Sequence, residues 1–181
     1  NFSFRNGPPR TGLSTPLEST SPSPTSLLES RGDTIMTDSM LIPCPHCSAI
    51  NRIPADRLHD HGMCGRCKKA LFDGHPVELG KANFDMHAAR SDLPLVVDFW
   101  APWCGPCRSM APAFSSAAAV LEPEFRLGKL NTEEENQIAA RYAIRSIPTL
   151  ALFHRGRELA RQSGAMGTDE IVRWVRHHAG R

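Results

Sequence analysis

The chain has 181 residues, of which 40% are hydrophobic and 22% charged, and its formal net charge is +2 at pH 7. This balance is typical of a globular protein, and the small charge gives no argument for binding to nucleic acid or an anionic membrane. No run of about 18 apolar residues occurs, so the sequence predicts no membrane-spanning helix.

Residues 1–39 are rich in Ser, Thr and Pro and show neither apolar alternation nor helical periodicity. Such a segment buries too little apolar surface to offset the entropy of ordering it, so we expect residues 1–39 to be disordered. A charged start followed by an apolar core is absent, so we see no secretory signal and expect a cytoplasmic chain.

Residues 40–75 form a small module with two Cys-x-x-Cys pairs, made of Cys44, Cys47, Cys64 and Cys67. Their spacing is within the range of tetrathiolate zinc sites. Four thiolates complete a tetrahedron and leave no open position, which favours one structural zinc ion. The module has few large apolar residues, so metal binding would supply its folding energy.

Other interpretations of this module stay open. A histidine ligand (His46, His59 or His61), a rubredoxin-like iron and two local disulfides are alternatives to the four-cysteine zinc site. Binding of nucleic acid or of a protein partner is an alternative function for the module. Residues 40–80 contain five Lys or Arg and four Asp or Glu. This near balance of charge gives no positive surface for binding the phosphates of a nucleic acid.

Residues 76–181 read as one α/β domain with its elements around a single sheet. The first half predicts a helix over 81–89, a buried strand over 95–100, a helix over 108–121 and a strand over 125–131. Pro112 is expected to kink the second of these helices.

The second half of this domain predicts a helix over 133–142, with acidic residues in its first turn. Two hairpin strands over 149–153 and 158–162 follow, and Thr168 is expected to cap a last helix. The order is therefore a βαβ unit followed by a ββα unit.

A third pair, Cys104 and Cys107, lies where the strand over 95–100 gives way to a helix. The unpaired N–H groups and dipole at a helix start favour a thiolate, which is the attacking species in disulfide exchange. Cys107 lies three residues on and is close enough to resolve a mixed disulfide.

Residues 98–107, Asp-Phe-Trp-Ala-Pro-Trp-Cys-Gly-Pro-Cys, resemble the active-site segment of the thioredoxin family. Residues 129–131, 145–149 and 163–165 resemble the family's second strand end, cis-proline segment and glycine loop. The cysteine module ahead of this domain resembles that of the zinc-binding, bacterial thioredoxin 2 type. The resemblance implies a thioredoxin fold, a central mixed sheet flanked by helices, with a small N-terminal zinc module.

The resemblance also implies roles for individual residues. Cys104 would be the nucleophile and Cys107 the resolving thiol. Asp98 would be the buried carboxyl that takes the proton of Cys107, and Lys129 would act on Asp98 electrostatically. Burial of a carboxyl raises its pKa toward that of a working general base. The implied substrate-binding residues are Trp103, Gly105, Pro106, Ile147, Pro148, Gly164 and Ala165.

The sequence as a whole thus predicts a monomeric, cytoplasmic protein-disulfide reductase without an organic cofactor. Its implied partners are disulfide-containing substrate proteins and an NADPH-dependent thioredoxin reductase, with no nucleic acid and no membrane. The zinc would be structural or redox-sensitive. A disulfide isomerase or oxidase is the alternative, and it would require a strongly acidic Cys104 and an oxidising compartment.

Overall fold

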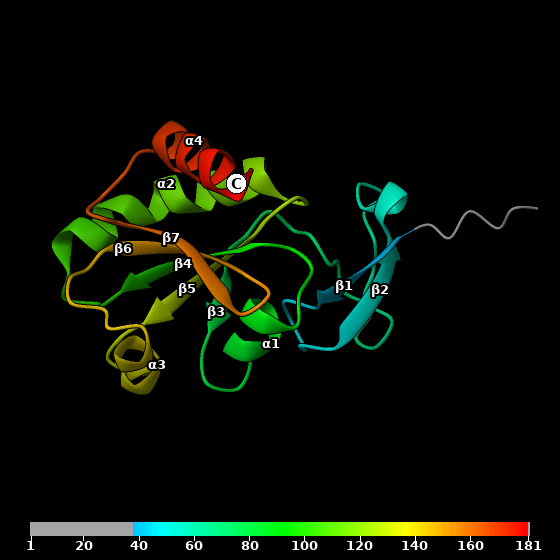
Figure 1. The fold of residues 1–181 in the computed structure, drawn as a ribbon, viewed down its shortest axis with the longest axis horizontal. Coiled ribbons are helices and arrows are strands. Elements are labelled where there is room, and N and C mark those ends of the chain that lie inside the picture. The colour runs from blue at the N-terminus through cyan, green and yellow to red at the C-terminus, as the bar shows by residue number, and fades with distance from the viewer. Residues whose placement is uncertain (1–37, 181) are drawn as a thin grey trace, which may run out of the picture. The chain divides into compact units, whose positions relative to one another are not determined.

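The computed structural model describes residues 38–180, which belong to one compact unit (Figure 1). The disorder expected for residues 1–39 lies outside the described residues except at its end, where Ser39 already begins a strand. Among residues 38–180, no helix is long and apolar enough to cross a membrane.

Two sheets organise the described chain. A two-stranded antiparallel sheet pairs β1 (Ser39–Pro43) with β2 (Ile50–Pro54), and the short 3-10 helix η1 (Ala55–Arg57) follows it. The larger sheet has the strand order β3-β5-β4-β6-β7, in which β3, β5 and β4 run parallel and β6 and β7 pair antiparallel. Its strands are β3 (Val77–Leu79), β4 (Leu95–Trp100), β5 (Arg126–Asn131), β6 (Thr149–His154) and β7 (Arg157–Ser163).

Four helices cover this sheet, with α2 and α4 on one face and α1 and α3 on the other (Figure 1). They are α1 (Phe84–Ala89), α2 (Gly105–Leu121), α3 (Asn136–Arg141) and α4 (Thr168–Ala179). Successive side chains of a strand point to opposite faces, so Val96 packs in the core under α2 while Val97 packs in the core under α1. The predicted mixed sheet flanked by helices is confirmed.

Two predictions of where a helix begins were wrong, and the hydrogen bonds at these positions show why. The helix expected over 133–142 begins only at Asn136, since Asn131 accepts the backbone N–H of Glu133 at 3.1 Å and holds the acidic residues in a turn. Thr168 does not cap α4: Gly167 is the N-cap, and its N–H donates to Glu170 at 2.8 Å. The Thr168 hydroxyl instead donates to the Ala113 carbonyl.

Other differences concern element extent. Helix α2 starts at Gly105, three residues before its predicted start, and runs through Pro112 as one helix. Helix α1 starts at Phe84 instead of residue 81, because Asn83 accepts the backbone N–H of Gly80 and closes a turn. The edge strand β3 and the strands of the cysteine module were not predicted.

The cysteine module packs against the residues that lead into β4 and β5. Ile42 and Leu58 form a small core with Leu93, and the backbone N–H of Leu41 donates to Asp92 at 2.7 Å. Leu93 precedes the first residue of β4 by two positions. The module therefore lies at the starting ends of the parallel strands.

Candidate redox and metal sites

Cys104 and Cys107 are joined by a disulfide at the start of α2. Cys104 is the N-cap residue, and its Sγ accepts the backbone N–H of Cys107 at 3.2 Å. Both residues are nearly inaccessible, with 4% and 2% of their surface exposed. On reduction, this N–H and the helix dipole would stabilise a thiolate at Cys104.

Asp98 is buried in β4, on the strand face that also carries Val96 and packs under α2. Only 1% of its surface is exposed, and neither carboxyl oxygen has a hydrogen-bond partner among the described residues. Burial raises the pKa of Asp98 to about 7, against the attraction of Lys129. The carboxyl therefore changes charge near neutral pH.

Lys129 is the register partner of Asp98 on the neighbouring strand β5. Its Nζ lies 4.5 Å from the centre of the Trp100 ring and 3.9 Å from a carboxylate oxygen of Glu78. The Lys129 charge lowers the pKa of Asp98, while Glu78 raises it.

The predicted substrate-binding residues come from three segments, of which the start of α2 and Ile147 lie at the disulfide. Gly105 and Pro106 form the first turn of α2, and the Ile147 carbonyl oxygen lies 3.8 Å from the Sγ of Cys104. The peptide bond between Ile147 and Pro148 is cis, and the Pro148 carbonyl accepts the N–H of Gly164 at 2.9 Å. No described hydrogen bond ties Ala165 to this group, although it directly follows Gly164.

Trp103 is the largest exposed side chain next to the disulfide, with 68% of its surface exposed. Its indole N–H donates to Glu133 at 3.0 Å. Together with Ile147, Ile144 and Ala139 it lines a shallow hollow of about 180 Å³. Thr132, Arg145 and Ser146 add polar groups to its lining. A hollow of mixed lining next to Trp103 and Ile147 suits an extended segment of a protein substrate.

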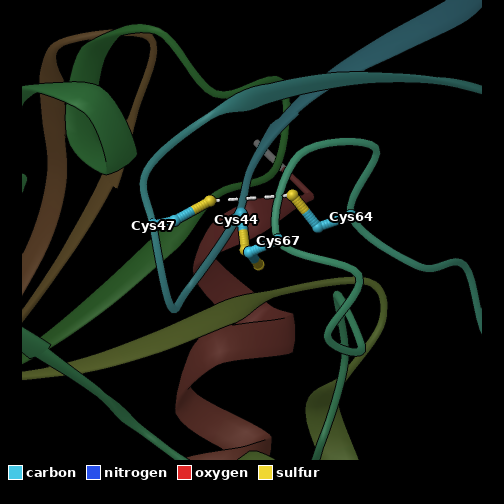
Figure 2. A group of neighbouring side chains, drawn as sticks. All are labelled: Cys44, Cys47, Cys64 and Cys67. Atoms are coloured by element: carbon cyan, nitrogen blue, oxygen red, sulfur yellow. Dashed lines mark hydrogen bonds between the residues drawn. The ribbon is translucent and has the colours of Figure 1, made fainter.

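Figure 2 shows Cys44, Cys47, Cys64 and Cys67 converging from two loops. All four sulfur atoms lie within 4.8 Å of one another, with 3.6 Å between those of Cys44 and Cys67 and 3.7 Å between those of Cys47 and Cys64. A tetrahedral zinc with Zn–S bonds of about 2.3 Å separates its sulfurs by about 3.8 Å. The four thiols thus fit a zinc ion.

The two loops that carry these cysteines repeat one backbone turn. The N–H of Ser48 donates to the Cys44 carbonyl at 2.9 Å, and the N–H of Lys68 donates to the Cys64 carbonyl at 3.0 Å. The residue after each second cysteine, Ser48 and Lys68, has a left-handed φ of 57° and 62°. The matching turns aim both pairs of sulfurs at one point.

The protonation of these thiols depends on their surroundings. Burial raises the pKa of Cys44 to about 12, whereas the backbone N–H of Cys67 is the main cause of a pKa of about 6 at Cys64. Asn51 also donates to the Cys64 sulfur, at 3.7 Å. All four residues are free thiols, so the alternative of two local disulfides is not what the structure contains.

Comparison with known proteins matches both parts of the chain. Residues 75–177 match the family Thioredoxin, and residues 43–69 match the zinc-ribbon family described as Thioredoxin 2, N-terminal. The chain belongs to the thioredoxin family. Membership makes this thioredoxin a protein-disulfide oxidoreductase.

Individual relatives agree with this assignment. Thioredoxin C-3 of Corynebacterium nephridii is 43% identical over 136 residues, which cover 75% of this chain and 93% of that protein. Thioredoxin 1 of Nostoc sp. is 40% identical over 102 residues, 56% of this chain and 95% of its own. A solved thioredoxin variant from Halobacterium salinarum superposes with a TM-score of 0.53 at 25% identity, covering 59% of this chain and 93% of that one.

Two features of this thioredoxin's sites were missed by the sequence analysis. Glu133, which holds the Trp103 indole, was read only as part of a helix, and nothing local in the sequence points to a residue 30 positions away. The ion pair of Arg126 with Glu122 was also missed, although a charged residue inside an apolar strand with an acid four positions before it was a visible signal.

Proposed function

We propose that this thioredoxin is a cytoplasmic reductant of protein disulfides, recharged by an NADPH-dependent thioredoxin reductase. The observation that supports it is the Cys104–Cys107 disulfide at the start of α2, next in sequence to a strand that buries an unpartnered Asp98. An exposed Trp103 and the cis-proline segment beside the disulfide give a protein substrate a place to bind. The chain is proposed to act as a monomer.

The reaction begins with the dithiol form. The Cys104 thiolate attacks one sulfur of a substrate disulfide, forming a mixed disulfide and releasing the other substrate sulfur as a thiolate. Cys107 then loses its proton to Asp98 and attacks the Cys104 sulfur. The S–S bond between Cys104 and the substrate breaks, and the second substrate sulfur also leaves as a thiolate. The substrate has then gained two electrons, and it becomes a dithiol with two protons taken from Asp98 and solvent. The Cys104–Cys107 disulfide remains for the reductase to reduce with two electrons from NADPH.

Each remaining site residue has a proposed part in this cycle. Lys129 limits the pKa of Asp98 by attraction. The backbone groups of Ile147 and Pro148 would form hydrogen bonds with an extended substrate segment, which would pair with them like an added strand. Trp103, Gly105, Pro106, Gly164 and Ala165 would line the surface that the substrate covers.

The module over residues 40–75 is proposed to hold one zinc ion through Cys44, Cys47, Cys64 and Cys67, with the catalytic domain over 76–181. Four thiolates leave zinc no open position for substrate, so the ion would hold the module's loops together. The proposed role is structural, and the same four thiolates are the groups that an oxidant would attack if the site is redox-sensitive.

The first test is the reduction potential of the Cys104/Cys107 pair in zinc-loaded protein, by thiol–disulfide titration. A value near about −270 mV is expected for a cytoplasmic reductant. A value near about −180 mV or higher would indicate an isomerase or oxidase. In parallel, Cys107→Ser should accumulate a mixed disulfide through Cys104, while Cys104→Ser should not.

A further inference from the structure

Three hydroxyl groups form a hydrogen-bonded ring around the cis-proline segment, which closes through the backbone carbonyl of Ser146. The Ser146 Oγ donates to the Ser163 Oγ at 3.2 Å, and the Thr149 Oγ1 donates to the Ser146 carbonyl at 2.7 Å. The Ser163 Oγ and the Thr149 Oγ1 lie 2.9 Å apart. The ring therefore begins and ends on Ser146.

The direction of the central bond follows from the other two. The Thr149 hydroxyl has one proton, and that proton is used on the Ser146 carbonyl. Ser163 must therefore donate to Thr149, and it can do so because it accepts from Ser146. Every hydroxyl proton is thus used once, in one direction around the ring, with Thr149 buried and Ser146 and Ser163 at the surface.

The ring encloses the residues that face the disulfide. Ser146 and Thr149 stand on either side of Ile147 and Pro148, so a single side chain from β7 ties both ends of the segment. Ser163 is the register partner of Thr149, and the next residue, Gly164, donates its N–H to the Pro148 carbonyl. The backbone of the segment is thus held at both ends, while the Ile147 carbonyl between them lies 3.8 Å from the Sγ of Cys104.

We propose that Ser146, Thr149 and Ser163 are positioning residues, which hold the backbone of Ile147 and Pro148 ready to pair with an extended protein substrate. The inference rests on the proposed function, since it concerns how that site receives its substrate. The three hydroxyls touch neither cysteine in the described contacts. Ser146 also lines the hollow beside Trp103, whereas Thr149 and Ser163 do not, so these two act through the segment that they tie.

The experiment compares two disulfide substrates in single variants. Ser163→Ala and Thr149→Val each open the ring, and Thr149→Ser restores the hydroxyl. Ser115→Ala, an exposed serine of α2, is the matched control. Reduction of insulin reports on an extended protein substrate, and reduction of 5,5′-dithiobis(2-nitrobenzoate) reports on the cysteines alone.

We expect KM for insulin to rise about three- to tenfold in both ring-opening variants, the range for one lost hydrogen bond. The kcat for insulin, the rate with the small disulfide and the reduction potential should stay as in the wild type, and Thr149→Ser should restore KM. An unchanged KM, or an equal loss of rate on both substrates, would overturn the inference. Failure of the proposed function would appear separately, as a wild-type chain that does not reduce insulin.

Discussion

The guanidinium of Arg126 donates a hydrogen bond of 2.6 Å to the backbone carbonyl of Leu71, 55 positions earlier in the chain. The same side chain forms an ion pair with Glu122, and it lies 5.0 Å over the ring of Phe72. The two charged side chains are only 2% and 4% exposed. This first residue of β5 thereby ties the cysteine module to the thioredoxin domain.

Arg126→Met should lower the free energy of unfolding by about 3–5 kcal/mol, because it leaves the Glu122 carboxylate buried without its partner. Burial alone already raises the pKa of Glu122, and the attraction of Arg126 opposes that shift. Urea denaturation of the folded, zinc-loaded chain measures the loss. The double variant Arg126→Met/Glu122→Met should recover much of it, and equal losses in single and double variants would contradict the ion-pair explanation.

Asp98→Asn should stabilise the protein at pH 8 and have little effect at pH 4. The folded-state pKa of Asp98 is raised from 3.8 to about 7, so the folded state holds a proton that the unfolded state releases. Below about pH 4 the Asp98 carboxyl is protonated in both states and costs the folded state nothing. As pH rises from about 4 to 7, the free energy of unfolding falls by roughly 4 kcal/mol, because the unfolded state alone releases the proton. Urea denaturation across this range, with the exposed Glu124→Gln as control, checks the difference; a pH-independent effect would refute it.

His87 is expected to give the opposite pH dependence. It is 1% exposed, and burial, with a smaller contribution from Arg126, lowers its pKa from 6.5 to about 4. Between these pH values His87 is protonated in the unfolded state and neutral in the folded state. The free energy of unfolding therefore falls by about 3 kcal/mol as pH decreases. His87→Gln should remove this loss, while the exposed His59→Gln should keep it.

The effects of His87 and Asp98 oppose each other over much of the same pH range, so the wild-type stability curve conceals both. The single variants are needed to separate them. Between pH 7 and 4.5, His87→Gln should gain more stability in urea than the wild type, and an equal change in both proteins would show that His87 is not the cause.

The purified, reduced chain should contain one zinc ion by elemental mass spectrometry. Cys64→Ser should bind it poorly, whereas Cys107→Ser should retain it, because the two cysteine sites are built from separate segments. Removal of zinc by a chelator should lower the thermal unfolding midpoint, and added zinc should restore it. A reduced wild-type chain without zinc would contradict the proposed metal site.

The sequence was most informative where the chemistry lies within a few positions. The Cys104–Cys107 pair and each knuckle of the zinc module are local, and the apolar run of β4 is long enough to identify a buried strand. Features that join distant positions were hidden. The edge strand β3 is three residues long and is defined by its pairing with β5, which no local pattern reveals.

The hydroxyl ring is hidden for the same reason. Serine and threonine are ordinary in turns and strands, and the relation of Ser163 to Thr149 appears only once β6 and β7 are in register. Arg126 is different, since its neighbour Glu122 is four positions away and both could have been suspected.

The position of the cysteine module sets a limit on electron flow within one molecule. The module contacts residues that lead into β4, and the disulfide follows the opposite end of that strand. Six strand residues span about 20 Å, far beyond the reach of one sulfur attacking another. The Cys104–Cys107 disulfide therefore cannot be exchanged directly with the four module cysteines of the same chain. Disulfide exchange between these two groups of cysteines needs a second molecule.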